Sequence, residues 1–302
     1  MRPFVGRTVL LGITGGIASY KSAWLARLLT KADAKVDTVL TRSATEFVSA
    51  MTFESLTGRR AHSGLFDAGA ALEHIRLAKA ADAVVVAPAT ADFLARAAGG
   101  QAGDLLTAIL LATKAPVLIV PAMNDQMWSH PQTQRNVAHL QELGYRVVNP
   151  EEGPLAAGEG EGPGRMPEPE TIFAHVGRLL EGDNALRGRR VVVTAGPTRE
   201  QIDPVRFVSN HSSGKMGAAL ASAAWRRGAD VTLVAGPMSV APPAGPTLRR
   251  VETTEEMAGV VGELLRSTDV LIMAAAPADF RPTTVATTKI KKGKKAPIIA
   301  MK

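Results

Sequence analysis

The sequence contains no cysteine among its 302 residues. Disulfide bonds, thiolate metal ligands and a thiol nucleophile are therefore excluded. Long apolar runs are missing as well. The most apolar window, residues 105–123, is interrupted by Lys114, Pro116 and Pro121, so it does not predict a membrane span. The apolar run Val9–Ile13 is too short for a secretory signal, and we expect a cytoplasmic protein with no membrane partner.

Aromatic side chains are scarce, at 4% of the sequence, whereas apolar residues as a whole make up 46%. This composition favours buried parallel strands covered by helices over a β-sandwich. The net charge is +7, but six lysines lie within residues 289–302, which contain no acidic residue. The rest of the chain is nearly neutral, so we expect no nucleic-acid partner.

The first half of the sequence predicts an α/β fold with a doubly wound parallel sheet, because short β-branched runs alternate with helical patterns. Within the first helix, we expect Trp24, Leu25, Leu28 and Leu29 to share one face. The predicted strands are Val9–Ile13, Val36–Leu40, Ala83–Ala87, Val117–Val120 and Tyr145–Val148. The predicted helices are Ser19–Lys31, Phe93–Ala98, Leu105–Thr113 and Gln132–Leu143.

A second, Rossmann-like α/β series begins at the run Arg190–Ala195, which resembles the first strand and its glycine-containing turn. Thr253 to Glu256 has the spacing of a capping box and predicts a helix that extends to Arg266. Only three strands are evident, so this domain looks incomplete. The other predicted elements are the helix Gly214–Arg227 and the strands Asp230–Ala235 and Asp269–Ala274.

Residues 149–169 are rich in Gly, Pro and Glu, and their composition alone is equally compatible with a linker. However, the helix pattern Glu170–Leu180 has the character of a closing helix of the first domain. The Gly-rich stretch is then an internal flap. We therefore expect two domains, residues 1–185 and 186–302.

Small and hydroxyl-bearing residues follow three of the predicted strands. After the first strand, small residues would let backbone N–H groups approach a phosphate at a helix N-terminus, although a simple tight turn is the alternative. The spacing is not that of a dinucleotide fingerprint. Hydroxyls after the next two strands would lie at the same sheet edge, unless they only cap helices. These residues are Gly15, Gly16, Ala18, Thr41, Ser43 and Thr90.

The segment Pro121–Trp128 contains Asn124 together with two methionines and a tryptophan, more than a turn requires. That composition favours the wall of a site. His74 precedes the third strand, and a lone histidine is more often structural than catalytic.

Together, His74, Ala87–Asp92, Pro121–Trp128 and residues 153–166 resemble the phosphopantothenoylcysteine decarboxylases, which belong to a wider family of flavin-dependent cysteine decarboxylases. Residues Thr194–Gly217 resemble the phosphopantothenate–cysteine ligases. The order of the two halves is similar to that of the bacterial bifunctional enzymes of coenzyme A biosynthesis.

For the first half, the resemblance implies a flavoprotein-type fold with FMN held by the small and hydroxyl residues above. It implies that His74 is the base, that Asn124 holds the substrate carboxylate and that Met127 packs nearby. The flavin of the family oxidises the thiol of 4′-phosphopantothenoylcysteine, carbon dioxide leaves, and the resulting enethiol is reduced to 4′-phosphopantetheine. Residues 149–169 become the substrate flap.

For the second half, the resemblance implies that 4′-phosphopantothenate is joined to cysteine through an acyl-cytidylate, with CTP and Mg²⁺. Asn210 would act on the acyl intermediate with Arg206 nearby, and no metal ligands are assigned. A lysine cation can stabilise charge on a transferring phosphoryl group, although Lys289 without the resemblance would be a solvated tail residue. The residues expected at CTP are Gly196, Ala274, Ala275, Asp279 and Lys289.

Two departures from the family lead us to expect impaired activity. Ala157 occupies the position of the family's flap cysteine, which helps to complete the final reduction, and the chain ends well before the family's ligase pattern does. Two alternatives stay open: a peptidyl-cysteine oxidative decarboxylase, which stops at the enethiol, and a non-catalytic regulatory flavoprotein. Because the family's sites lie between subunits, we expect a trimer-based homo-oligomer.

Overall fold

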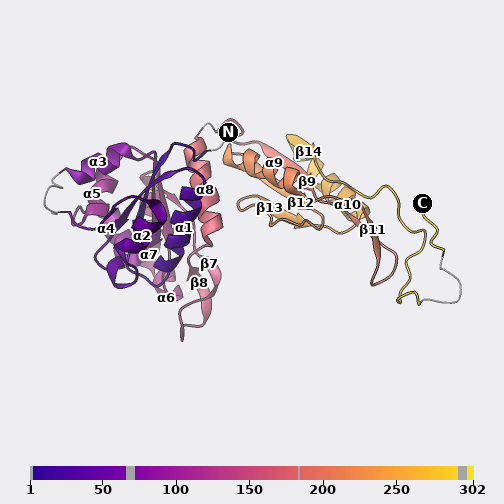
Figure 1. Cartoon of the computed structure of the whole chain (residues 1–302), viewed down its shortest axis with the longest axis horizontal. Coiled ribbons are helices and arrows are strands. Elements are labelled where there is room, and N and C mark those ends of the chain that lie inside the picture. Colours follow the sequence, from indigo (N-terminus) through magenta and orange to yellow (C-terminus); the bar gives the residue numbers. More distant parts are fainter. Residues whose placement is uncertain (1–2, 66–71, 183, 292–297) are drawn as a thin grey trace. The chain divides into compact units, whose positions relative to one another are not determined.

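The structure is a computed structural model that describes residues 3–65, 72–182, 184–291 and 298–302 (Figure 1). The chain divides into two compact units, Met1–Glu181 and Gly182–Lys302, slightly before the boundary expected from the sequence. Each unit is built on its own parallel sheet. Within the described ranges, no helix combines the length and the apolar character that crossing a bilayer requires.

The first unit contains a six-stranded parallel sheet in the order β3-β2-β1-β4-β5-β6, with helices on both faces (Figure 1). The doubly wound sheet predicted from the sequence is confirmed. Its strands are β1 (Thr8–Ile13), β2 (Lys35–Leu40), β3 (Ala61–His62), β4 (Ala83–Ala89), β5 (Val117–Pro121) and β6 (Arg146–Val147). Its longer helices are α1 (Ser19–Lys31), α2 (Ala50–Thr57), α3 (Glu73–Ala80), α4 (Ala91–Ala98), α5 (Leu105–Ala112), α7 (Pro131–Glu142) and α8 (Pro169–Glu181).

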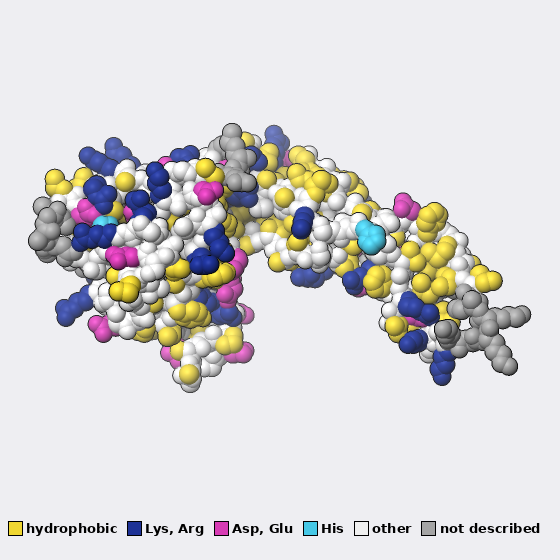
Figure 2. Space-filling view, viewed as in Figure 1, with side chains coloured by type: hydrophobic (Ala, Val, Ile, Leu, Met, Phe, Trp, Pro, Cys, Tyr) yellow, Lys and Arg dark blue, Asp and Glu magenta, His cyan; other side chains and the backbone are white. Residues whose placement is uncertain are grey.

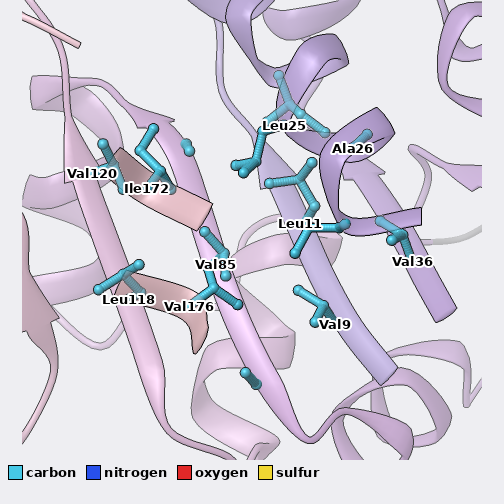
Figure 3. Packing of buried hydrophobic residues seen from close by; sticks show 14 of the residues in the cluster. Val9, Leu11, Leu25, Ala26, Val36, Val85, Leu118, Val120, Ile172 and Val176 are labelled. Carbon is cyan, nitrogen blue, oxygen red and sulfur yellow. The ribbon is translucent and has the colours of Figure 1, made fainter. Parts of the chain in front are cut away.

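Two apolar clusters, one on each face of the sheet, hold the first unit together. Alternate residues of β1 and β4 belong to opposite clusters, as the period-two geometry of a strand requires. Figure 3 shows Val9, Leu11 and Val85 packed against side chains of α1 and α8. Leu10, Val84 and Val86 belong to the other cluster, with α3, α4, α5 and α7. Burial on both faces explains why these strands are continuously apolar.

One expectation for α1 is wrong in part. Leu25 and Leu29 are buried in the cluster between α1 and the sheet, but Trp24 is 46% exposed. The indole Nε1 of Trp24 instead donates a hydrogen bond to Glu170 Oε1 on α8, at 2.8 Å. The indole therefore lies at the edge of the helix interface, where its N–H reaches a polar partner and part of its ring stays in water.

The Gly-rich stretch forms an antiparallel hairpin of β7 (Glu151–Pro154) and β8 (Glu161–Arg165), which projects beyond the helices of its unit in Figure 1. Glycine is required here by close backbone approach, because a Cβ on Gly164 would lie 2.1 Å from the carbonyl oxygen of Met123. Met123 N–H in turn donates to Gly164 O at 3.0 Å. The hairpin therefore lies directly on the turn that follows β5.

The second unit contains four parallel strands in the order β13-β12-β9-β14, and the count of three expected from the sequence is wrong. The strand that was not predicted is β13 (Thr247–Arg250). It is short, and its two arginines leave it without the apolar run that predicts a buried strand. The capping box is confirmed, since the Thr253 side chain accepts from Glu256 N–H at 3.1 Å. The remaining elements are β9 (Arg190–Ala195), β10 (Arg199–Gln201), β11 (Phe207–Ser209), α9 (Lys215–Arg226), β12 (Asp230–Ala235), α10 (Thr254–Leu265) and β14 (Val270–Met273).

Two helical glycines of the second unit differ in the space around them, so the same substitution should have opposite effects on stability. A Cβ on Gly217 of α9 would lie 2.5 Å from Ala195 Cβ on β9, whereas a Cβ on Gly259 of α10 would meet no atom within 4 Å. We expect Gly217→Ala to destabilise the unit by about 1–3 kcal/mol through overpacking. Gly259→Ala should stabilise it by up to about 1 kcal/mol through helix propensity. Urea unfolding of both variants tests this, and equal stabilities would contradict the packing of α9 on β9.

Candidate functional site

A cavity of about 440 Å³ lies in the first unit, where β1, β4 and β5 end. The strand order reverses between β1 and β4, so the cavity occupies the topological switch point of the sheet. Ligands of open α/β sheets bind at this place, outside the carboxyl ends of the strands. The hairpin β7–β8 supplies the opposite wall through Leu155, Ala156, Glu159 and Arg165.

The loop after β1 is fixed by close contact with its two neighbouring loops. A Cβ on Gly15 would lie 2.3 Å from Ser43 Cβ, so only glycine fits at this point. On the other side, Thr14 Oγ1 donates to Pro88 O at 2.9 Å and accepts from Thr90 N–H at 3.1 Å. At Gly15 and Gly16 the loop therefore brings its backbone to the cavity wall.

Six of the residues predicted for the first half line this cavity: Gly15, Gly16, Ala18, Thr90, Asn124 and Met127. Asn124 caps the short helix α6 (Asp125–Ser129), where its Oδ1 accepts from Gln126 N–H at 2.9 Å. This bond orients the amide group at the cavity wall. Thr90 Oγ1 also caps a helix, because it accepts from Phe93 N–H of α4 at 3.3 Å.

Four predicted residues are not among those that line the cavity. Ser43 packs behind Gly15, and Thr41 is buried with its hydroxyl accepting from Ala44 N–H at 3.3 Å. Ala157 lies in the hairpin tip between β7 and β8, whose neighbours Ala156 and Glu159 do reach the cavity. His74 lies in the first turn of α3.

The start of α3 is tied to the sheet through Glu73, the residue before His74. The Glu73 carboxylate accepts from the Arg76 guanidinium at 2.5 and 2.8 Å and lies 3.1 Å from His62 Nδ1 on β3. The Arg76 hydrogen bond is the main reason that the pKa of Glu73 is lowered. Burial lowers the pKa of His62, although the Glu73 charge opposes that change. His74 therefore stands on a turn whose position is fixed.

Sequence reasoning missed three charged residues at the cavity: Lys21, Glu159 and Arg165. A lysine in the first turn of an amphipathic helix is usually solvent-exposed, and the composition of the flap gives no reason to single out Glu159 or Arg165. Elsewhere the surface has its usual mixture, and Figure 2 shows Lys and Arg interspersed with Asp and Glu over the visible face of the first unit.

In the second unit, the loops after β9 and β14 bring together most of the residues predicted at CTP. Thr194 Oγ1 accepts from the N–H groups of Ala274 and Ala275, both at 3.1 Å. Gly196 O accepts from Ala276 N–H at 2.9 Å. Asn210 Nδ2 donates to Pro277 O at 2.8 Å and to Asp279 Oδ2 at 3.3 Å, which joins Asn210 to the same group.

Asp279 also lines an open cavity of about 490 Å³ in this unit, together with Glu200, Glu255 and Arg281. Glu255 is paired with Arg281 at 2.7 Å, and Glu200 Oε1 accepts from Thr254 N–H at 2.8 Å. With the Asn210–Asp279 bond, these contacts engage all three carboxylates. Over the part of the chain that the structure describes, no group of three His, Cys, Asp or Glu side chains could hold a metal ion.

Arg206 and Lys289 are connected through a residue that sequence reasoning did not select. Asp203 is fully buried, and its carboxylate accepts from Val205 N–H, from Ile290 N–H and from both the backbone and the guanidinium of Arg206, at 2.5–3.1 Å. Arg206 also donates to Ile290 O at 3.1 Å. The segment that carries the exposed Lys289 is thus tied to the β10–β11 hairpin through its neighbour Ile290.

Comparison with known proteins identifies both units. The family described as Flavoprotein matches residues 2–181, and the DNA/pantothenate metabolism flavoprotein C-terminal domain matches residues 186–302. The coenzyme A biosynthesis bifunctional protein CoaBC of Mycobacterium tuberculosis is 49% identical over 298 residues, which cover 97% of this chain and 71% of that protein. The protein of the same name from Vibrio cholerae is 48% identical over 296 residues, covering 97% and 74%.

Two solved structures resemble the first unit. A mutant PPC decarboxylase complexed with pantothenoylaminoethenethiol is 31% identical, with a TM-score of 0.52, and the match covers 58% of this chain and 99% of that one. The FMN-dependent cysteine decarboxylase SpaF is 34% identical, with a TM-score of 0.50, and the match covers 59% and 97%. The resemblance found in the sequence motifs is confirmed.

The buried Asp203 predicts how the second unit responds to acid. The hydrogen bond from the Arg206 guanidinium, together with those from three backbone N–H groups, holds the pKa of Asp203 far below its usual 3.8. A carboxyl whose pKa falls on folding stabilises the folded state above its unfolded pKa, and that stabilisation is lost as the pH falls. Asp203→Asn should therefore destabilise the unit at neutral pH, and its deficit should shrink between about pH 5 and pH 3.

Unfolding midpoints against pH would measure this difference. The matched control is Asp230→Asn, because Asp230 is exposed on β12 and its replacement should change stability little. A deficit for Asp203→Asn that stays constant from neutral to acid pH would show that the charge of Asp203 is not what holds the segment.

Proposed function

Because this chain belongs to the family of the bifunctional coenzyme A biosynthesis proteins CoaBC, we propose that each of its units carries one of the two activities. The first unit binds FMN and decarboxylates 4′-phosphopantothenoylcysteine. The second unit uses CTP and Mg²⁺ to join 4′-phosphopantothenate to cysteine. The observation that carries the proposal is the cavity at the switch point of the first sheet, which is walled by Gly15, Gly16, Thr90 and Asn124.

The loop after β1 fits the phosphate of FMN. Helix α1 begins after Ala18, which offers no side-chain cap, and its first turn contains no acidic residue, so no negative charge opposes an anion at the positive end of the helix dipole. The hydroxyl of Ser19 is buried and has no hydrogen-bond partner within the described ranges. A buried polar atom without a partner is costly, and a phosphate that reached Ser19 behind the lining residues would remove that cost.

When bound, FMN would supply the two-electron oxidation of the substrate thiol. The chain's own residues would hold the substrate carboxylate through the Asn124 amide, with Met127 packing against the substrate. Proton removal needs His74, which does not line the cavity of its own chain. A second copy of the chain would supply that histidine, and this is the reason to propose a homo-oligomer.

Ala157 bears on the last step of the decarboxylation. A methyl group can neither donate a proton nor act as a thiol, so the flap of this chain lacks the group that would complete reduction of the enethiol. Oxidation and loss of carbon dioxide need only the flavin, the base and the carboxylate pocket. The enethiol should therefore accumulate as the product.

The ligase proposal for the second unit is supported by the grouping of Gly196, Ala274, Ala275 and Asp279 with Asn210 after β9 and β14. Activation is required because a carboxylate resists attack by an amine. Lys289 would stabilise negative charge on the transferring phosphoryl group. The sequence predicts three strands and hence an incomplete domain, whereas the structure contains four parallel strands. CTP-dependent coupling by the chain itself is the direct measurement.

The first test of the decarboxylase proposal is FMN binding. The purified protein should be yellow and should carry FMN rather than FAD. Gly15→Ala should weaken FMN binding about tenfold or more, because the added methyl displaces the loop from Ser43 at a cost of about 1–3 kcal/mol. Gly103→Ala is the matched control in the same unit, since its added Cβ would meet no atom within 4 Å. A colourless protein that takes up no FMN on titration would overturn the proposal.

The second test follows the product of one anaerobic turnover by mass. The unaltered chain should bleach the flavin and convert 4′-phosphopantothenoylcysteine to its enethiol, whereas Ala157→Cys should release 4′-phosphopantetheine. Equal yields of 4′-phosphopantetheine from both proteins would show that another group supplies the proton. Turnover of a peptide with a C-terminal cysteine, but not of 4′-phosphopantothenoylcysteine, would favour the peptidyl-cysteine decarboxylase.

A further inference from the structure

Lys21 is a cation in an unusual position, because its side chain is only 9% exposed. It projects from the first turn of α1, and its Nζ donates to Met166 O at 2.8 Å and to Glu168 Oε1 at 3.1 Å. Burying an ammonium group is costly unless it is paired and hydrogen-bonded. Both partners belong to the segment that directly follows β8, so the contacts that stabilise this lysine also join α1 to the base of the hairpin.

Glu168 extends the connection into the hairpin itself. The same oxygen that accepts from Lys21 is also bonded by the guanidinium of Arg165, the last residue of β8. Partial burial acts to raise the pKa of Glu168, but the hydrogen bonds and charges of Lys21 and Arg165 outweigh it, and the pKa is lowered. The carboxylate therefore stays ionised and can hold both cations.

Arg165 continues the connection across the hairpin to its other strand. A Cβ on Gly153 of β7 would lie 3.2 Å from Arg165 Nη1 and 3.4 Å from its Cδ, so the arginine side chain crosses that strand at close range. Lys21 and Arg165 both line the cavity. A continuous set of contacts thus runs from α1 through Glu168 to both strands of the hairpin, along the edge of the cavity.

We propose that Lys21 is a positioning residue, which with Glu168 anchors the β7–β8 hairpin to α1 and so keeps the hairpin over the cavity. The anchor fixes the substrate wall relative to the loop at the start of α1. Its effect on decarboxylation rests on the function proposed above, whereas its effect on the hairpin does not. Both Lys21 contacts are to the segment at the base of the hairpin, and they are what the proposal rests on.

Lys21→Met tests the anchor with little change in shape, since methionine fills a similar space without a charge that needs partners. Amide hydrogen exchange within Glu151–Arg165 should become roughly ten- to a hundredfold faster, the effect of losing charge-assisted hydrogen bonds. Exchange in α8, beyond the hairpin, should not change. Glu168→Gln should accelerate exchange over the same residues, so the test does not depend on one variant.

The matched control is Trp24→Phe. It removes the Trp24–Glu170 hydrogen bond, which also joins α1 to α8 but is exposed and lies outside the hairpin. Hairpin exchange in this variant should equal that of the unaltered protein. Faster exchange in Trp24→Phe equal to that in Lys21→Met would show a general loosening of α1, and would overturn the proposal.

Ligand measurements on the same samples separate the two proposals. If the anchor acts as proposed, Lys21→Met should keep its bound FMN and raise KM for 4′-phosphopantothenoylcysteine more than it lowers kcat. Loss of FMN with unchanged hairpin exchange would make Lys21 a direct ligand contact and would overturn the anchor. If the unaltered protein takes up no FMN, the proposed function fails, and the exchange comparison still decides whether Lys21 holds the hairpin.

Discussion

The first unit depends on how closely the backbone after β1 approaches its neighbours. Gly15 has no room for a Cβ beside Ser43, and the Thr14 hydroxyl bridges the peptide groups of Pro88 and Thr90. These contacts join the ends of three parallel strands into one rim. The cavity lies at the switch point beside that rim, where Gly15 and Gly16 have no side chain to fill it.

The second unit repeats this construction with different residues. Its strand order, β13-β12-β9-β14, matches the first four positions of the first sheet, and its switch point lies between β9 and β14. Thr194 corresponds to Thr14, because its hydroxyl also bonds the neighbouring strand's loop: it accepts from the N–H groups of Ala274 and Ala275. Gly196 has a φ of +77°, which favours glycine, and it opens the loop beside this bridge. The two units thus build their rims by the same means.

The elements predicted correctly from the sequence are those that the local sequence pattern determines. Ser19–Lys31, Arg190–Ala195 and Asp230–Ala235 were predicted to the residue, because apolar periodicity fixes them. The hairpin and β13 were missed because tertiary contacts stabilise them rather than their own composition. At the site, the small residues after β1 predicted where the rim of the cavity lies. The burial of Lys21 could not be predicted, because it depends on contacts with Met166 and Glu168, which are far along the chain.

The hairpin shows why such a buried cation belongs in this fold. The strands Glu151–Pro154 and Glu161–Arg165 contribute no residue to either apolar cluster of the first unit, so hydrophobic burial does not hold them in place. The first residue beyond them, Met166, does enter a cluster, and its carbonyl oxygen is the one that Lys21 bonds. A flap rich in glycine and proline can pass close to the turn after β5, but its strands lack large apolar side chains that could anchor it. Its position must therefore be set from its base, where packing of Met166 and the charge of Lys21 act together.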